Sequence, residues 1–218
     1  MKAAKQKTAT IVVPSEAGIA AESVVWGPIM WDILFCAAFE SKLGTFTHSQ
    51  VVDLLCLLPS ILPCPSCRAS CEEFCKHLPP AAIPDGDASQ WLWTMKDTVN
   101  QKLNRPQRNY DDVKRRYAAF GLLQRDATVL TLCVIVALGG DDDRAGAIYR
   151  FFSALVAVRP SLAMYMQPGL TDVECRTATR TEIIEVAVAA VARQTGCAPN
   201  LPHLMAQIIR RPRVRPPT

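Results

Sequence analysis

The sequence predicts an all-helical protein of 218 residues. No stretch alternates apolar and polar residues with a period of two, which is the pattern of a half-buried strand. Instead, apolar residues recur at spacings of three and four, and several of these stretches begin at residues that cap helices. Hydrophobic residues make up 50% of the chain, so it can bury a sizeable core.

The first two predicted helices each carry an apolar stripe. The first begins at Gly27-Pro28 and places three aromatic side chains on one face, namely Trp31, Phe35 and Phe39. Thr47, with Gln50 three residues later, forms a capping box for the second helix. The buried face of the second helix precedes Pro59 and consists of Val51, Leu54, Leu55 and Leu58.

Three more helices follow. After an extended approach at Leu62-Pro63, Cys64 at the N-cap and Pro65 at the first helical position predict a third helix, which ends near Pro79-Pro80. A fourth helix runs from about Ser89 to Leu103, and its apolar side consists of Trp91, Met95, Val99 and Leu103. Asn109 caps a short fifth helix, whose apolar contacts are Val113, Tyr117 and Phe120.

These elements suggest a division of the chain. We expect residues 1–22 to form a flexible lead, residues 23–121 a first helical domain and residues 122–209 a helical extension of unknown function. The helices expected in the extension are Ala127–Leu138, Arg144–Val158 and Thr181–Arg193. The basic Pro/Arg tail, residues 210–218, is interpreted as a solvated, polyproline-like end, with a nucleic-acid or localisation element as the alternative.

The stretch Cys64-Pro65-Ser66-Cys67 predicts redox chemistry. Two thiols separated by two residues at a helix start can close and reopen a disulfide. Unpaired amides and the positive end of the helix dipole stabilise a thiolate there, and Arg68 adds a cation. We expect Cys64 to be the more exposed sulfur and Cys67, one turn into the helix, to be the more shielded one. The pair is therefore predicted to carry electrons.

A metal site is the alternative, because Cys71 and Cys75 follow the pair. In that case the chain is a non-enzymatic, zinc-stabilised helical interaction module that uses the Cys64–Cys75 cluster. Against this, Cys67, Cys71 and Cys75 recur at every fourth residue, which spreads the sulfurs along one helix face instead of converging them on a metal. A thioredoxin-like fold is excluded because no βαβ pattern surrounds the motif.

The remaining cysteines and the histidines form no second motif. Cys175 and Cys197 are interpreted as a structural disulfide, with a relay pair or two free thiols as alternatives. Three cysteines within apolar stretches are expected to be buried and inert: Cys36, Cys56 and Cys133. Three isolated histidines are expected at the surface or at helix caps: His48, His77 and His203.

Composition and charge exclude several classes. A net charge of +4 is too small to imply a polyanionic partner, so we expect no nucleic acid to bind. The longest apolar segment, Val129–Leu138, is about half of what a bilayer span requires, and no apolar run follows the first lysines as in a signal peptide. Nine cysteines without visible export favour thiol chemistry over structural disulfides.

Several separated motifs carry a family resemblance. They are Trp26-Gly27, Trp31 and Leu34, then Leu62-Pro63-Cys64-Pro65-Ser66-Cys67-Arg68, then Trp91-Leu92, Val99-Asn100, Lys102-Leu103, Arg105-Pro106 and Val113 through Arg116-Tyr117. In order and spacing these motifs resemble the FAD-dependent sulfhydryl oxidases of the Erv/ALR family. The likeness spans about Val25 to Phe120. It implies a four-helix bundle with a short fifth helix that binds FAD, usually as a homodimer.

The resemblance also implies an activity, a flavin-linked thiol oxidase (thiol:oxygen oxidoreductase). Dithiol-containing client proteins or a thioredoxin-like relay would attack Cys64, and Cys67 would pass the electrons to FAD and then to O2, which gives H2O2. The implied cofactor-binding residues are Gly27, Trp31, Phe35, Phe39, Lys96, Val99, Asn100, Lys102, Leu103, Arg105, Arg116 and Tyr117. Flat aromatic faces suit the rings of FAD, and cations can balance its pyrophosphate.

The chain departs from the cellular members of that family at three places. Phe35 replaces a His, Lys96-Asp97 replaces a His-Asn pair, and Trp93 and Tyr110 stand where two cysteines are bridged. We interpret the last change as replacement of a structural disulfide by aromatic packing. The first-helix Phe and the Leu-Pro-Cys-Pro-x-Cys-Arg motif resemble the versions encoded by large DNA viruses. We therefore expect a viral protein located in the host cytoplasm or the virion.

Overall fold

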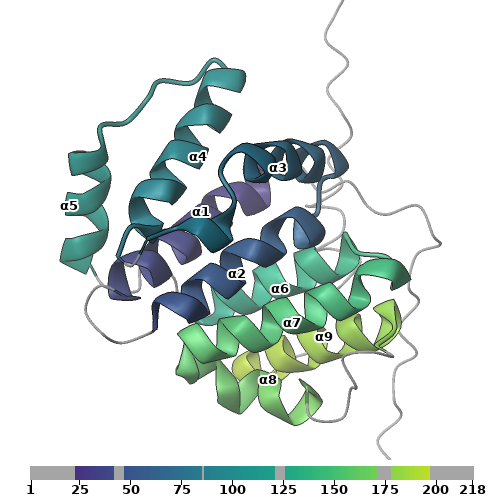
Figure 1. Ribbon diagram of the computed structural model, residues 1–218. Coiled ribbons are helices and arrows are strands. Elements are labelled where there is room, and N and C mark those ends of the chain that lie inside the picture. Colours follow the sequence, from purple (N-terminus) through teal and green to yellow (C-terminus); the bar gives the residue numbers. More distant parts are fainter. Residues whose placement is uncertain (1–22, 42–46, 85, 121–125, 171–177, 197–218) are drawn as a thin grey trace, which may run out of the picture.

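The structure is a computed structural model that describes residues 23–41, 47–84, 86–120, 126–170 and 178–196 (Figure 1). Within these ranges the protein is all-α and has no strand, which confirms the predicted fold class. The helices are α1 (Ser23–Ser41), α2 (His48–Ile61), α3 (Pro65–His77), α4 (Ala88–Lys102), α5 (Tyr110–Phe120), α6 (Asp126–Leu138), α7 (Asp142–Val158), α8 (Ala163–Leu170) and α9 (Arg180–Thr195). Two 3-10 turns are η1 (Pro80–Ala82) and η2 (Pro160–Leu162).

Some sequence predictions concern parts of the chain outside the described residues. They are those for the lead 1–22, for the basic tail 210–218, and for Cys175, Cys197 and His203.

The capping signals correctly predict where helices begin. Thr47 Oγ1 accepts a hydrogen bond from the Gln50 amide at 3.2 Å, and the Gln50 side chain accepts one from the Thr47 amide at 2.9 Å. The Asp111 amide donates to Asn109 Oδ1 at 2.9 Å where α5 begins. Helix α9 begins at Arg180, one residue before the predicted range, because Thr179 and Glu182 form a capping box.

Prolines led the sequence analysis to wrong helix boundaries. Helix α1 begins at Ser23, so Pro28 lies inside it, and α2 continues through Pro59 to Ile61. A proline within a helix costs roughly 3 kcal/mol. Burial of apolar side chains outside the predicted limits offsets this cost: Trp26 is 5% exposed and Ile61 is 1% exposed. Helix α8 was not predicted, because it is short and contains Pro168 and Gly169.

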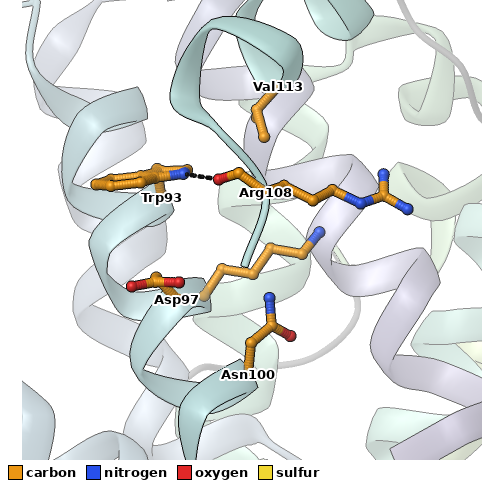
Figure 2. A pocket seen from close by; sticks show the side chains of 6 residues that line it. Trp93, Asp97, Asn100, Arg108 and Val113 are labelled. Atoms are coloured by element: carbon orange, nitrogen blue, oxygen red, sulfur yellow. Dashed lines mark hydrogen bonds between the residues drawn. The ribbon is translucent and has the colours of Figure 1, made fainter. Parts of the chain in front are cut away.

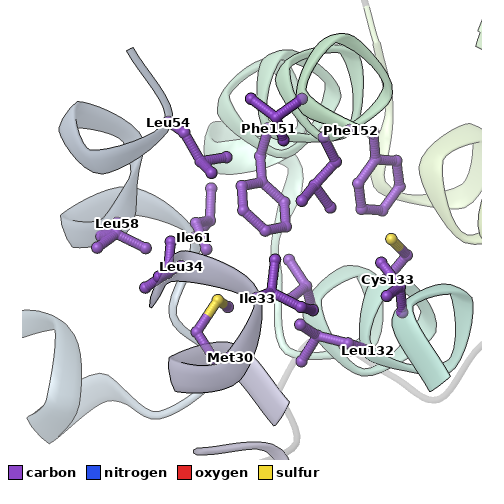
Figure 3. Packing of buried hydrophobic residues seen from close by; sticks show 14 of the residues in the cluster. Met30, Ile33, Leu34, Leu54, Leu58, Ile61, Leu132, Cys133, Phe151 and Phe152 are labelled. Atoms are coloured by element: carbon purple, nitrogen blue, oxygen red, sulfur yellow. The ribbon is translucent and has the colours of Figure 1, made fainter. Parts of the chain in front are cut away.

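A single hydrophobic core runs through the molecule from Trp26 to Val191. Helix α7 lies against α2 and helix α6 against α1, while α9 packs on both α6 and α7 and α8 packs on α9 (Figure 1). Figure 3 shows Leu54 and Ile61 of α2 facing Phe151 of α7. The core crosses the predicted boundary between residues 23–121 and residues 122–209. The division of the chain into two domains at that boundary stays a prediction.

The apolar helices are shorter than a membrane span. Among the described residues no single helix is long and apolar enough to cross a bilayer. Together, Asp142–Val158 and Pro160–Gln167 have that length and composition, but they are bent by 117°.

Substitution of Leu54 tests the shared core. Leu54 is fully buried between the two halves of the chain. We expect Leu54→Ala to lower the free energy of unfolding by about 2–5 kcal/mol, through lost burial and the cavity left behind. Chemical denaturation followed by circular dichroism should show one transition for the whole chain. Met164→Ala, at a side chain that is 70% exposed, is the matched control. Two separate transitions, with only one affected by Leu54→Ala, would contradict the shared core.

Candidate functional site

The redox motif lies at a tight junction between two helices. Only Leu62, Pro63 and Cys64 separate α2 from α3. As predicted, Cys64 is the N-cap of α3 and a proline occupies the first turn. Cys64 has extended backbone angles, and its sulfur accepts a hydrogen bond from the Cys67 amide at 3.3 Å. Arg68 Nη1 donates to the Leu62 carbonyl at 2.7 Å. The start of α3 is therefore tied to the end of α2 on both sides of the first sulfur.

The two sulfurs differ in acidity although both are partly buried. Burial disfavours the Cys64 thiolate, but hydrogen bonds from Cys67 and Ser66 outweigh it and lower the pKa of Cys64. The Ser66 hydroxyl lies 3.1 Å from the Cys64 sulfur. Burial, with the hydrogen bond to Cys64 and its charge, raises the pKa of Cys67 to about 12, although Lys102 opposes this. Cys64 is thus the better nucleophile and the better leaving group.

A cleft of about 1120 Å³ opens beside the pair, between α1, α3, α4, α5 and the segment that joins α4 to α5. Ligand sites in proteins span about 300–1,000 Å³, so the cleft has room for a dinucleotide. Both sulfurs line it, together with ten of the twelve predicted cofactor residues: Gly27, Trp31, Lys96, Val99, Asn100, Lys102, Leu103, Arg105, Arg116 and Tyr117. The outer half of α4 faces this cleft rather than a core, so Leu103, predicted as apolar packing, is 47% exposed.

Phe35 and Phe39 do not line the cleft. Phe35 is completely buried, and its ring stacks on Tyr117 with centroids 5.1 Å apart. The Phe39 ring lies 6.0 Å from the same tyrosine. The predicted aromatic stripe therefore divides: Trp31 reaches the cleft, and the two phenylalanines form a layer behind Tyr117.

The cleft has an apolar wall and a cationic wall. Trp26, Met30, Trp31, Leu34, Leu62 and Met95 contribute apolar surface. The cations are Lys96, Lys102, Arg105, Arg108 and Arg116. Flat rings pack well on the first kind of surface, and phosphate groups pair with the second. This donor set fits a cofactor such as FAD, which has two ring systems joined by a pyrophosphate.

Asp32 organises one end of the cleft and was not singled out from the sequence. Its Oδ1 accepts a hydrogen bond from the Tyr117 hydroxyl and lies 3.8 Å from Arg116 Nη2. Burial and this contact raise the pKa of Tyr117, which keeps the phenol protonated. The available signal was a single carboxylate within the apolar stretch Ile29–Phe39.

Lys96 occupies the place of the histidine discussed above. Its ammonium lies 5.4 Å from the Trp31 ring centroid and 5.2 Å from that of Phe35, within cation–π range. Burial lowers the pKa of Lys96 to about 8, and the nearby Asp32 opposes this shift. Lys96 is therefore still mostly charged at neutral pH, but it loses its proton more readily than an exposed lysine.

A small recess of about 10 Å³ adjoins the cleft and is shown in Figure 2. There the Trp93 indole donates to the Arg108 carbonyl at 2.8 Å. Trp93 and Tyr110 meet edge to face with centroids 5.9 Å apart, and the Tyr110 hydroxyl lies 2.8 Å from Ser89 Oγ. Aromatic packing thus joins α4 to α5 at the two positions where the resemblance implies a disulfide.

The other described cysteines do not form a metal site. Among the residues that the structure describes, no group of three or more His, Cys, Asp or Glu side chains is placed to hold a metal ion. Cys36 and Cys133 are buried, as expected. Cys56 is exposed, so the expectation for it was wrong: position 56 lies off the α2 stripe that packs into the core. On α3, a hydrogen bond with Cys75 and burial raise the pKa of Cys71.

The described histidines lie at helix ends. His48 is the first residue of α2, and its Nε2 lies 3.0 Å from the Ile83 carbonyl. His77 is the last residue of α3 and lies 3.2 Å from Glu73. Both positions agree with the prediction of surface or cap residues.

The site is a pair of thiols at a helix N-terminus, in an all-helical protein, beside a cleft lined by apolar and cationic side chains. The Erv1 / Alr family model matches residues 29–118, which is less than half of the chain. The family is known for FAD-dependent sulfhydryl oxidase activity. No curated protein and no solved structure matches the chain.

Substitution of Ser66 tests the origin of the reactivity of Cys64. Ser66→Ala removes one hydrogen bond to the Cys64 sulfur, so we expect the pKa of Cys64 to rise by about 1. Because the thiolate reacts, the rate at which iodoacetamide modifies Cys64 in the reduced protein should fall roughly tenfold below the pKa. Mass spectrometry of the Cys64 peptide measures the rate of modification over a range of about pH 5 to 10. Ser153→Ala is the control, because that hydroxyl bonds only to its own helix at Tyr149. An unchanged profile in Ser66→Ala would refute the assignment.

Proposed function

We propose that this protein is an FAD-dependent sulfhydryl oxidase that forms disulfides in client proteins. The observation that carries the proposal is the juxtaposition of an acidic thiol and a shielded thiol, Cys64 and Cys67, with a cleft that has an apolar and a cationic wall. The family match supports the same activity. A zinc-stabilised interaction module is not supported by any metal-binding geometry in the described residues.

The thiol chemistry proceeds in two exchanges. A client thiolate attacks the Cys64 sulfur of the Cys64–Cys67 disulfide, forms a mixed disulfide and releases the Cys67 thiolate. Cys67 is the poorer leaving group of the two, but Cys64 is uncharged in the mixed disulfide, so its charge no longer opposes the Cys67 thiolate, and Lys102 stabilises that thiolate. The second client thiolate then attacks the client sulfur of the mixed disulfide and releases Cys64. Because the pKa of Cys64 is lowered, Cys64 leaves readily. The client gains a disulfide, and the protein gains a reduced pair.

FAD, when bound, would accept this electron pair and pass it to O2, which gives H2O2. Lys102, Arg105 and Arg116 would hold its pyrophosphate, and the Trp31 ring would contact a flat face of the cofactor. The remaining lining residues of the predicted set would complete the cradle. Phe35 and Phe39 would act through Tyr117, because they support it from behind.

Further parts of the proposal extend the family resemblance. Clients would be dithiol proteins or a thioredoxin-like relay, and the protein would be a homodimer. Residues 23–121 would form the FAD-binding unit. The origin would be a large DNA virus, with the protein in the host cytoplasm or the virion. Light scattering on the purified chain tests the dimer directly.

Substitution of Cys67 tests the oxidase. We expect Cys67→Ser to abolish oxygen consumption with dithiothreitol, because the attacked disulfide can no longer form, while the protein stays folded and yellow. Absorption spectra and an oxygen electrode measure both properties. Cys56→Ser, at an exposed thiol outside the cleft, should retain full turnover. Normal turnover in Cys67→Ser would contradict the assignment, and so would a colourless wild-type protein that loses helicity with a chelator.

Substitution of a cleft cation tests how the cofactor is held. Arg105→Gln removes one positive charge from the cleft, so we expect the dissociation constant of FAD to rise about tenfold. Quenching of flavin fluorescence on titration into the stripped protein measures the affinity. Arg150→Gln removes an exposed cation from α7 and should leave the affinity unchanged. Equal affinities in Arg105→Gln and wild type would place the pyrophosphate elsewhere.

A further inference from the structure

The connection between α6 and α7, which we call the α6–α7 turn and define as Leu138–Arg144, lies against the redox junction although it is outside the family match. We propose that this turn is a positioning element of the redox site: it fixes the Leu62–Pro63 segment and Arg68, and it thereby sets the reactivity of Cys64. The inference rests on the proposed thiol chemistry of Cys64 but does not require the flavin.

The closest approach is between two backbones. A Cβ atom on Gly139 would lie 2.8 Å from both Cα and Cβ of Pro63 and 3.2 Å from its carbonyl oxygen. Such distances require glycine, because the backbone of Pro63 cannot move aside as a flexible side chain would. Pro63 is buried by this contact even though it directly precedes Cys64. The turn therefore limits where the first sulfur can lie.

The second link is a charge interaction with Arg68, the residue that donates to the Leu62 carbonyl. Asp141 caps α7 by accepting the Arg144 amide at 3.1 Å, and its carboxylate holds the Arg144 guanidinium at 2.6 Å. Asp141 attracts Arg68 and Arg144 repels it, and the charge of Arg68 interacts with both Cys64 and Cys67. A carboxylate from the C-terminal region thus partly offsets the cation beside the reactive sulfur.

The turn is itself held rigidly. Arg144 Nη2 donates to the Gly139 carbonyl at 3.2 Å, and the amide of Gly139 donates to Ile135 at 3.0 Å. The guanidinium of Arg180, at the start of α9, donates to the Leu138 carbonyl at 3.1 Å. The position of the redox junction is therefore determined partly by helices that carry no chemical motif of their own.

Polar and charged groups from three parts of the chain surround the sulfur pair. Ser66 and Arg68 come from α3, and Lys102 comes from α4 and acts on Cys67. Asp141, the N-cap of α7, and Arg144 in its first turn act on Arg68. A change in the α6–α7 turn should therefore alter the acidity of Cys64 in a direction that depends on which contact is changed. A purely structural role of the turn would change stability alone.

Gly139→Ala tests the backbone contact. The added Cβ must displace Pro63, which misaligns the N-cap, so we expect the pKa of Cys64 to rise and the iodoacetamide rate below the pKa to fall about threefold. Gly169→Ala is the matched control. Its Cβ would lie 3.2 Å from Val186 Cγ2, so it strains the contact between α8 and α9, away from the redox site. Peptide mass spectrometry measures Cys64 in the full chain, and thermal melts confirm folding. Equal Cys64 profiles in folded Gly139→Ala and Gly169→Ala would overturn the proposal.

Asp141→Asn tests the charge and decides the matter if Gly139→Ala does not fold. Asparagine still caps α7, but Arg68 loses its neighbouring anion, so we expect the pKa of Cys64 to fall and the rate to rise about twofold below the pKa. Asp87→Asn is the matched control: it removes an exposed carboxylate at the N-cap of α4, outside the turn, where the side chain makes no capping hydrogen bond, so the Cys64 profile should not change. Identical profiles for the two variants would overturn the proposal. A protein that shows these shifts but binds no FAD would retain this inference and lose the oxidase.

Discussion

The redox site depends on a backbone constraint: one helix ends and the next begins within three residues, and the reactive sulfur lies at that break. The Cys64 sulfur accepts an amide hydrogen bond at the start of α3 because those amides have no partners within the helix. Arg68, one turn later, returns to the Leu62 carbonyl and closes the junction. The lowered pKa of Cys64 therefore depends on the helix start, whereas the raised pKa of Cys67 follows first from its burial.

The same junction connects the two halves of the chain. Helix α2 contributes Leu54 and Ile61 to a core that Phe151 of α7 completes, and burying each such side chain contributes about 1.5–3 kcal/mol. Helix α2 leads directly into the redox motif, and Pro63 at that junction is also in close contact with Gly139, which lies between α6 and α7. The C-terminal helices are thus part of the framework that holds the site, although they supply none of the reacting atoms.

Local signals predicted the helix starts around the candidate site, and tertiary packing explains what the sequence did not predict. The capping box at Thr47 and the N-cap at Cys64 depend on a few neighbouring residues, so they could be predicted from sequence. The burial of Phe35 behind Tyr117, the exposure of Cys56 and the contact of Gly139 with Pro63 depend on helices far apart in the chain. The family resemblance assigned both Trp31 and Phe35 to the cofactor, and of the two only Trp31 lines the cleft.

The side chains that line the cleft carry an excess of positive charge. Five cationic side chains line it, against the two carboxylates of Asp32 and Glu73. Burial lowers the pKa of Lys96 to about 8, and repulsion from the nearby arginines, Arg108 and Arg116, contributes a smaller part of this shift. An anionic group in the cleft would reverse this effect, since it favours the charged ammonium and relieves the repulsion among the arginines. A ligand that binds only the folded state in this way also stabilises it, so cofactor retention and the stability of α4 and α5 should be linked.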